Sequence, residues 1–314
     1  MKNMVRLTSN FVKIIEEICQ EENIELESFS SNWIFRLYKD GKYNYIIRHQ
    51  FGLNTASVHT ICCDKSAASE IMSSFNIPNV EHFFFMSPIN QKSINDMGNW
   101  ELLKNKLNEY GQLVCKSNEG FGGKNVFRVS NQYELENAVH KIFGESGSMA
   151  VSPYYEVCNE FRVIVLDGTI KIIFSKQRPY IVGDGIHSMG SLIFTQLQDE
   201  CINNTIATIE DDLTTVLDKG EIFYLNRKHN LGQGAIAEGI EDNIIKNKLE
   251  SIVNVIAEKL NIRFASIDIV EVNNEYKVLE INSGVMMEHF SQRNENYYNI
   301  TKSIYKEAIL KMLV

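Results

Sequence analysis

FASIDIVEV (264–272) and YKVLEIN (276–282) are predicted to be two β-strands joined by a turn of two asparagines. Side chains alternate along a strand, so Glu280 and Asn282 share one face of the second strand. Pairing of the two strands as a hairpin brings Asp268 close to both residues. Three oxygen ligands at one place suit a hard cation such as Mg²⁺.

The alternative is that Glu280 and Asn282 form the solvent-facing side of an alternating strand. For an isolated pair of this kind, that situation is the commoner one. Glu280, however, stands among apolar residues of its strand, where an unpaired carboxylate is costly to bury. Asp268 at the matching position of the hairpin favours the metal site.

A second feature is the glycine-rich segment SNEGFGGKN (117–125), which Lys116 directly precedes. Gly120, Gly122 and Gly123 permit positive φ angles and close approach of the backbone, so consecutive amide N–H groups can surround phosphate oxygens. The segment lies between two predicted strands and does not match the P-loop pattern, which predicts a flexible lid. A plain glycine-rich hairpin turn is the alternative.

Other polar residues stand beside turns or element ends. Glu160 opens a strand, where a carboxylate can accept hydrogen bonds from ribose hydroxyls, although an ordinary surface glutamate is the alternative. Lys65 precedes a predicted helix and is either a phosphate ligand or an exposed lysine. The basic residues that could bind an anionic substrate or a phosphoryl group, unless they are simply solvated, are Arg162, Arg178, Arg227, Lys228 and Arg293.

Composition limits the classes of function. The chain has 314 residues, 44% of them hydrophobic, and a formal net charge of -9, as is typical of a globular protein. The acidic balance argues against a nucleic-acid partner. Six cysteines without CxxC spacing favour reduced thiols and a cytoplasmic protein. Neither a signal peptide nor a membrane-spanning helix is predicted.

The rest of the chain mixes amphipathic helices with short strands and hairpins, which predicts an α+β fold. Helices are expected at residues 10–19 with Asn10 as the N-cap, 66–75, 133–143, 244–261 and 297–312. Strands are expected at 43–48, at 83–85, on both sides of the glycine-rich segment, and as a hairpin at 161–177.

In chain order, these motifs resemble the ATP-grasp superfamily: Asp-Lys before a helix, a strand lysine with a glycine lid, NEFRV (159–163), an aspartate and ExN. Three stretches resemble, more narrowly, the ATP-grasp part of cyanophycin synthetase and the glutathione synthetase-type ligases. They are ICCDKSAASEIM (61–72), RPYIVGDGIHSMGSLI (178–193) and FYLNRKHNLGQGA (223–235).

The resemblance implies a fold in which two α+β subdomains enclose ATP and Mg²⁺. It predicts an N-terminal pre-ATP-grasp region at 1–98, a small lid subdomain at 99–157 and a C-terminal core with the metal site at 158–314. Position by position, it implies that the nucleotide contacts Lys65, Lys116, Gly120, Gly122, Gly123, Tyr154, Tyr155 and Glu160, with the two tyrosines in the hinge that binds adenine. The implied Mg²⁺ ligands are Asp268, Glu280 and Asn282.

The resemblance also suggests catalytic and substrate residues. Arg227 and Lys116 are the catalytic candidates, and the candidates for substrate contact are Arg162, Arg178, His187, Asn230, Ser283 and Gly284. Two departures from the family pattern concern this side of the site. A proline usually follows the ExN motif, but here the run is INSGVMMEHF (281–290). Ser266 replaces a phosphoryl-stabilising arginine of some relatives, so Arg227 or Arg162 would have to supply that charge.

The function expected from the resemblance is ATP-dependent joining of a carboxylate to an amine through an acyl phosphate, with amino acids or a small peptide as substrates. A ligase that modifies a ribosomally made precursor peptide is one alternative, and a non-catalytic ATP-binding regulator is another. No nucleic acid and no membrane is expected as a partner. The short region before Lys65 predicts a small acceptor pocket or one completed by a second subunit of a homodimer.

Overall fold

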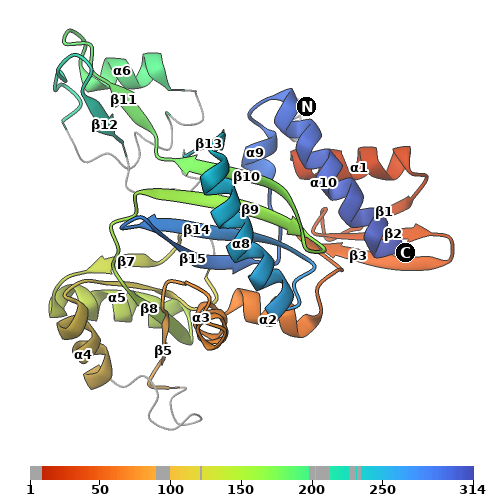
Figure 1. Ribbon diagram of the computed structural model, residues 1–314, viewed down its shortest axis with the longest axis horizontal. Helices are drawn as coiled ribbons and strands as arrows, with labels where there is room; N and C mark the ends of the chain where they lie inside the picture. The colour runs from red at the N-terminus through yellow and green to blue at the C-terminus, as the bar shows by residue number, and fades with distance from the viewer. Residues whose placement is uncertain are drawn as a thin grey trace, which may run out of the picture.

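The computed structural model describes residues 9–89, 100–120, 122–197, 202, 212–225, 231 and 235–314. These residues form three antiparallel β-sheets, a separate two-stranded ribbon and the helices that cover them (Figure 1). The α+β fold class expected from the sequence is confirmed. Within these ranges, no helix is both long and apolar enough to cross a membrane.

The N-terminal sheet has the strand order β1-β2-β3-β4. Its strands are β1 (Glu25–Phe29), β2 (Ile34–Lys39), β3 (Lys42–Ile47) and β4 (Gln50–Phe51). Helices α1 (Asn10–Glu21) and α10 (Glu295–Leu313) pack together against this sheet, so the first and last described helices lie side by side (Figure 1).

The start of α1 differs from the prediction. Ser9, not Asn10, is the N-cap, because the Ser9 hydroxyl accepts a hydrogen bond from the Val12 N–H. The N–H groups of Asn10 and Phe11 donate to the carboxylate of Glu288 in α9 (Glu288–Ser291), each at 2.8 Å. A carboxylate is favourable here because the first N–H groups of a helix have no partner within the helix.

The second sheet, which we call the small sheet, has the order β5-β8-β6-β7. Its strands are β5 (Phe83–Met86), β8 (Ser148–Pro153), β6 (Leu113–Ser117) and β7 (Val126–Val129). Helices α4 (Trp100–Tyr110) and α5 (Gln132–Glu145) cover one face, where Leu113, Cys115 and Met149 are buried. Because side chains alternate along β6, Lys116 points from the opposite face.

The third sheet, the central sheet, has the order β13-β10-β9-β14-β15. Its strands are β13 (Ile236–Gly239), β10 (Thr169–Gln177), β9 (Asn159–Leu166), β14 (Phe264–Val272) and β15 (Glu275–Asn282). One face packs against α8 (Asn243–Lys259), α2 (Ala56–Cys63) and α3 (Lys65–Ser74). The other face joins the N-terminal core through Ile164, Leu166 and Phe174.

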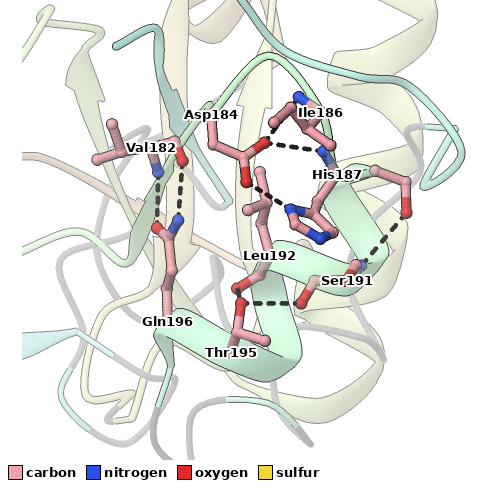
Figure 2. Close-up of polar contacts among 9 residues, drawn as sticks. Val182, Asp184, Ile186, His187, Ser191, Leu192, Thr195 and Gln196 are labelled. Carbon is pink, nitrogen blue, oxygen red and sulfur yellow. Dashed lines mark hydrogen bonds and ion pairs between the residues drawn. The ribbon is translucent and has the colours of Figure 1, made fainter. Parts of the chain in front are cut away.

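A ribbon of β11 (Tyr180–Val182) and β12 (Ile222–Tyr224) extends away from the central sheet with α6 (Met189–Gln196) beside it (Figure 1). Figure 2 shows how its turn is held: the Gln196 side chain pairs with both backbone groups of Val182, and Asp184 accepts from two N–H groups and the imidazole of His187. Only glycine fits at position 183, because a Cβ there would clash with the Asp218 carbonyl oxygen at 2.2 Å.

The elements named in the sequence analysis occur at the expected places, with ends shifted by a few residues. No expectation from the sequence covered the strands β1, β2, β4, β8, β11, β12 and β13 or the helices α2, α4, α6 and α9. The division into three regions stays a prediction. Strand β5 precedes residue 98 but pairs with β8, so the small sheet includes a strand from the proposed N-terminal region.

Candidate functional site

The hairpin of β14 and β15 brings the three proposed metal ligands together. Asp268 is paired with Glu280 in the strand register, and Ser266 is paired with Asn282. Asn282 Nδ2 donates to Glu280 Oε1 at 3.2 Å. The register shifts immediately after Asp268, as in a β-bulge, a feature that often redirects a side chain beside a functional site.

Asp268 is only 2% exposed and forms the centre of a buried charge network. Arg162 Nε and Nη2 each donate to one carboxylate oxygen at 2.7 Å, and Lys176 Nζ lies 2.8 Å from Oδ2. Burial by itself would raise the pKa of Asp268, but the two cations outweigh burial and hold the pKa well below its usual range. Asp268 is therefore a carboxylate at neutral pH.

Lys176 also connects Asp268 to the proposed ribose ligand. Its Nζ donates to Glu160 Oε1 at 2.5 Å. The pKa of Glu160 is raised, first by burial and then by the negative charges of Asp268 and Glu280, although Lys176 opposes this effect. Lys176 did not feature among the sequence candidates. Its signal is weak: a lysine in the β-branched run TIKIIFSKQ (169–177), two residues after buried Phe174.

Lys116 faces this network from the small sheet. The side chain is buried, and burial lowers the pKa of Lys116 to about 8, with Glu280 and Glu160 opposing the decrease. Those two carboxylates belong to β15 and β9, so Lys116 acts electrostatically across the gap between the small and central sheets. No hydrogen bond joins Lys116 Nζ to another of the described residues, so the ammonium of this largely buried side chain can bind an anion.

Lys65 connects α3 to the glycine-rich loop. Its Nζ donates to the carbonyl oxygens of Asn118, at 3.3 Å, and Gly120. The buried Asn118 side chain in turn accepts from the N–H and hydroxyl of Ser66 at 3.1 and 2.9 Å. Burial lowers the pKa of Lys65, and the negative charge of Glu280 partly offsets this effect. Both lysines therefore lie within electrostatic range of the same carboxylate.

The loop connects β6 and β7, as predicted, and each of its three glycines has a backbone reason to be there. Gly122 and Gly123 have φ angles of 70° and 73°, which side chains other than glycine rarely adopt. A Cβ on Gly120 would lie 2.9 Å from the Ser117 Cβ.

Tyr154 and Tyr155 lie in the connection from β8 of the small sheet to β9 of the central sheet. The Tyr154 N–H donates to the Gln112 carbonyl at 3.0 Å, and the Arg128 guanidinium stacks 3.8 Å from the Tyr154 ring centre. Tyr155 packs with Val80 and Leu279. The proposed hinge therefore has one residue anchored on each sheet.

The proposed substrate residues lie in two places. Ser283 is buried directly after Asn282, and its hydroxyl is 2.5 Å from Nδ1 of His59 in α2, a residue that the sequence analysis did not select. Gly284 follows. A Cβ added to Gly284 would come no closer than 3.8 Å to its nearest neighbour, the backbone of His49. Arg178 stacks on Tyr224 and His187 binds Asp184, both in the ribbon region. Arg227 and Asn230 lie outside the described residues.

The donor set fits a magnesium ion that completes its coordination with phosphate and water. Among the described residues, no group of three His, Cys, Asp or Glu side chains is arranged to hold a metal by itself. Both oxygens of Asp268 already bind cations, so Asp268 could bind a metal only by sharing an oxygen, whereas the second oxygen of Glu280 and the amide oxygen of Asn282 have no hydrogen bond to the described residues. Mg²⁺ is commonly held by one or two carboxylates together with substrate phosphates.

Comparisons with known proteins agree with this geometry. No family model matches the chain. The cyanophycin synthetase of Synechocystis sp. is 24% identical over 253 residues, which are 73% of this chain and 27% of that protein. The cyanophycin synthetase of Geminocystis herdmanii is 26% identical over 196 residues, which are 56% of this chain and 22% of that protein. The chain thus spans about a quarter of the length of these relatives.

Two solved structures share the architecture. A bifunctional glutathione synthetase from Pasteurella multocida has a TM-score of 0.57 at 15% identity, covering 95% of this chain and 44% of that one. A D-alanine–D-alanine ligase from Bacillus anthracis has a TM-score of 0.50 at 16% identity, covering 81% of this chain and 66% of that one. The chain has the ATP-grasp fold.

Within this fold, Arg162 is the arginine that lies beside the proposed metal ligands. Ser266, which replaces the arginine of some relatives, pairs with Asn282 in the strand register. Arg162 on neighbouring β9 is paired with Asp268 and binds its carboxylate with two hydrogen bonds. A guanidinium is therefore present beside the proposed metal ligands, although it comes from a different strand.

Proposed function

We propose that this chain uses ATP to convert a carboxylate into an acyl phosphate and then joins it to an amine, with an amino acid or a small peptide as substrate. The observation that carries the proposal is the opposition of charges between two sheets. Lys116 on the small sheet and Lys65 on α3 both interact with the charge of Glu280 on the central sheet, and Lys116 also interacts with that of Glu160. Such a gap suits a molecule that carries both phosphates and a divalent cation.

The phosphates bind at the end of the gap where the glycine-rich loop leaves β6. Lys116 contributes a buried positive charge without a hydrogen-bonding partner among the described residues. Lys65 bonds to loop carbonyls, so movement of the loop changes the position of its charge. Backbone amide groups of the glycine-rich loop are proposed as the remaining donors.

The nucleoside binds at the opposite end, where the chain crosses from β8 to β9. The backbone around Tyr154 and Tyr155 contacts the adenine, and Leu279 packs beside Tyr155 in the same cluster. Glu160 keeps one oxygen free for the ribose, because only Oε1 binds Lys176. The hinge and Lys116 thereby fix the direction in which the nucleotide lies.

Mg²⁺, held by Glu280, Asn282 and a shared oxygen of Asp268, would neutralise phosphate charge when bound. The residues of the chain position the reactants and offset charge. Arg162, held by Asp268, presents its guanidinium to the phosphoryl group, and Arg227 is proposed to assist. Closure of the loop over the phosphates would exclude water, since hydrolysis of an acyl phosphate competes with ligation.

The amine is proposed to enter beside Ser283 and Gly284. The hydrogen bond between Ser283 and His59 connects the segment after Asn282 to α2, which belongs to the region before Lys65. The acceptor pocket is therefore built from both ends of the described chain. Its polar groups are a hydroxyl, an imidazole and backbone amides, which suit an amino acid or peptide amine.

The test is a mass-spectrometric screen of amino acids and dipeptides with ATP and Mg²⁺, read as condensed products together with ADP. We expect ADP release that requires both an acid and an amine. Glu280→Gln should abolish it, and Glu275→Gln, an exposed carboxylate on the same strand, is the matched control. Nucleotide binding without ADP release across the whole panel would favour an ATP-binding regulator, and activity only with a longer peptide would favour precursor modification.

A further inference from the structure

We propose that His82 is a positioning residue for Lys116: its Nε2, which has no hydrogen-bond partner in this structure, accepts a hydrogen bond from the lysine ammonium once that side chain reorients, and the bond aims the remaining N–H groups at the phosphates. This inference rests on the proposed nucleotide site. His82 lies just before β5 and did not feature among the sequence candidates. Four observations carry the proposal, and they concern the free nitrogen, the side-chain face, the neighbouring charges and the charge of the imidazole.

The first observation is an unsatisfied atom. His82 is 6% exposed, and its Nε2 is the one buried side-chain nitrogen or oxygen among the described residues that has no hydrogen-bond partner. Buried polar groups almost always have partners, so an exception requires an explanation. The other ring nitrogen bonds to the Val80 backbone carbonyl, which assigns the proton to Nδ1. Nε2 therefore presents a lone pair and acts as an acceptor.

The second observation is which side of the small sheet carries His82. Phe84 of β5 and Lys116 of β6 both pair with Ala150 of β8, from opposite sides. Residues paired in this way point from the same face of a sheet. His82 is two residues before Phe84, so the alternation places it on that face too. The helices α4 and α5 cover the opposite face, where Phe85 is buried.

The third observation is the set of charges around the two groups. The pKa of Lys116 is affected by the charges of Glu280 on β15, Glu160 on β9 and Lys65 on α3. The pKa of His82 is lowered by the charge of Lys116 and, more weakly, by that of Lys65. The Ser69 hydroxyl accepts from the His82 N–H at 3.0 Å and fixes the backbone of His82. An acceptor with one free lone pair is thus within electrostatic range of an ammonium that has no hydrogen bond to the described residues.

The fourth observation is that the imidazole is neutral. Burial, followed by the charge of Lys116, lowers the pKa of His82 well below its ordinary value. A carboxylate in the same place would neutralise Lys116 and compete with the phosphates. A neutral acceptor can orient the ammonium and stabilise its charged form while leaving its charge for the ligand.

The test compares His82→Leu with His82→Gln. Leucine removes the acceptor, whereas the glutamine amide oxygen can replace Nε2. The protonation of Lys116 is followed by ¹⁵N NMR of lysine side chains in the protein without nucleotide, with Lys116→Arg used to assign the signal. We expect His82→Leu to move the Lys116 titration to lower pH and to reduce kcat/KM for ATP about tenfold. His82→Gln should restore most of both.

Thermal unfolding shows whether a defect of His82→Leu arises merely from loss of structure. Leucine removes a nitrogen without a partner in this structure, but it also removes the ring's hydrogen bond to the Val80 carbonyl, so we expect the unfolding transition of His82→Leu to stay close to that of the original protein. An unchanged Lys116 titration in His82→Leu, or equal defects in both variants, would overturn the proposal. A defect specific to ATP over GTP would place His82 against the base instead and overturn it too. The titration needs no turnover, so a failure of the proposed function remains distinguishable.

Discussion

Two carboxylates of the central sheet bind the same kinds of partner in different surroundings. Asp268 accepts two hydrogen bonds from Arg162, both at 2.7 Å, and lies 2.8 Å from Lys176. Asp167, in the turn between β9 and β10, accepts two from Arg263 at 2.8 and 3.0 Å and lies 3.0 Å from Lys311.

The exposed fraction of the side chain is 2% for Asp268 and 26% for Asp167. Water can replace the partners of Asp167 but not those of Asp268. An exposed ion pair contributes little to stability, whereas removal of one partner from a buried pair leaves an uncompensated charge. The buried cluster is therefore expensive to assemble and to break. Its position beside Glu280 and Asn282 gives a functional reason for its presence.

The largest expected effect is from Asp268→Asn. The substitution keeps the shape of the side chain but leaves Arg162 and Lys176 with excess buried positive charge. We expect the free energy of unfolding to fall by about 3–5 kcal/mol, measured by urea denaturation at pH 7. The matched control is Asp167→Asn, for which a loss of similar size would contradict the role assigned to burial.

The next effect separates stability from activity. Glu280→Gln and Lys116→Ala remove charges that face the gap between the sheets, not charges inside the Asp268 cluster. We expect each to lower turnover by about 100-fold or more, as when one preorganised electrostatic group is lost, with little change in unfolding. ADP release with the true substrates is the measurement, and Lys277→Ala provides an exposed lysine control on β15. Near-normal ADP release by both variants would falsify the assigned roles.

Arg162→Lys tests whether the geometry of the pair matters as well as its charge. Lysine keeps the positive charge but cannot make the two parallel hydrogen bonds to Asp268. We expect stability to fall by about 2 kcal/mol, roughly the value of a lost hydrogen bond to a charged group. Turnover should also fall if the guanidinium contacts the phosphoryl group. A variant with full stability would show that charge alone holds the cluster.

The difference between these two clusters also explains what the sequence could predict. The meeting of Asp268 with Glu280 and Asn282 follows from strand alternation and one short hairpin, which are local properties, and the strand register agrees. The pairing of Asp268 with Arg162 depends on β9 lying next to β14, a contact between residues about a hundred positions apart. Lys176 enters through yet another strand, so no local pattern could identify it.

Other features that could not be predicted from the sequence were missed for related reasons. The strand ELESF (25–29) is mostly exposed and polar, so it lacks the apolar alternation that marks a half-buried strand. His82 is distinguished only by an unsatisfied nitrogen, and that is a property of packing. Local periodicity could reveal the metal hairpin and the glycine-rich loop. The neighbours that balance their charges could be identified only from the tertiary arrangement.

The lowered pKa of Lys116 predicts that activity and stability respond in opposite directions to alkaline pH. Its pKa is lowered to about 8 by burial, below the value near 10.4 of an unfolded lysine. Between these values the unfolded chain binds the additional proton, so this group makes stability increase as pH rises from about 8 toward 10. Activity that needs the ammonium should fall about fivefold between about pH 8 and 9. A pH–rate profile and unfolding curves over that range test both signs, and Lys116→Ala should lose the stability trend.

The smallest effect is expected at Asp167, the exposed counterpart of Asp268. Hydrogen bonding from Arg263, with a further contribution from Lys311, lowers the pKa of Asp167 to about 2. A group whose pKa is lowered in the folded state stabilises the fold above its unfolded pKa, and this contribution disappears as pH falls through the folded value. Solvent screening limits the contribution to about 1 kcal/mol or less at neutral pH.

Asparagine at position 167 tolerates the positive φ angle of 46° found there, so Asp167→Asn changes the charge and not the turn. We expect its stability difference from the original protein to be small at pH 7 and to vanish between about pH 4 and pH 2, measured by urea denaturation. A difference that persists at pH 2 would show that the aspartate acts through the shape of the turn. The contrast with Asp268 would then rest on backbone conformation as well as burial.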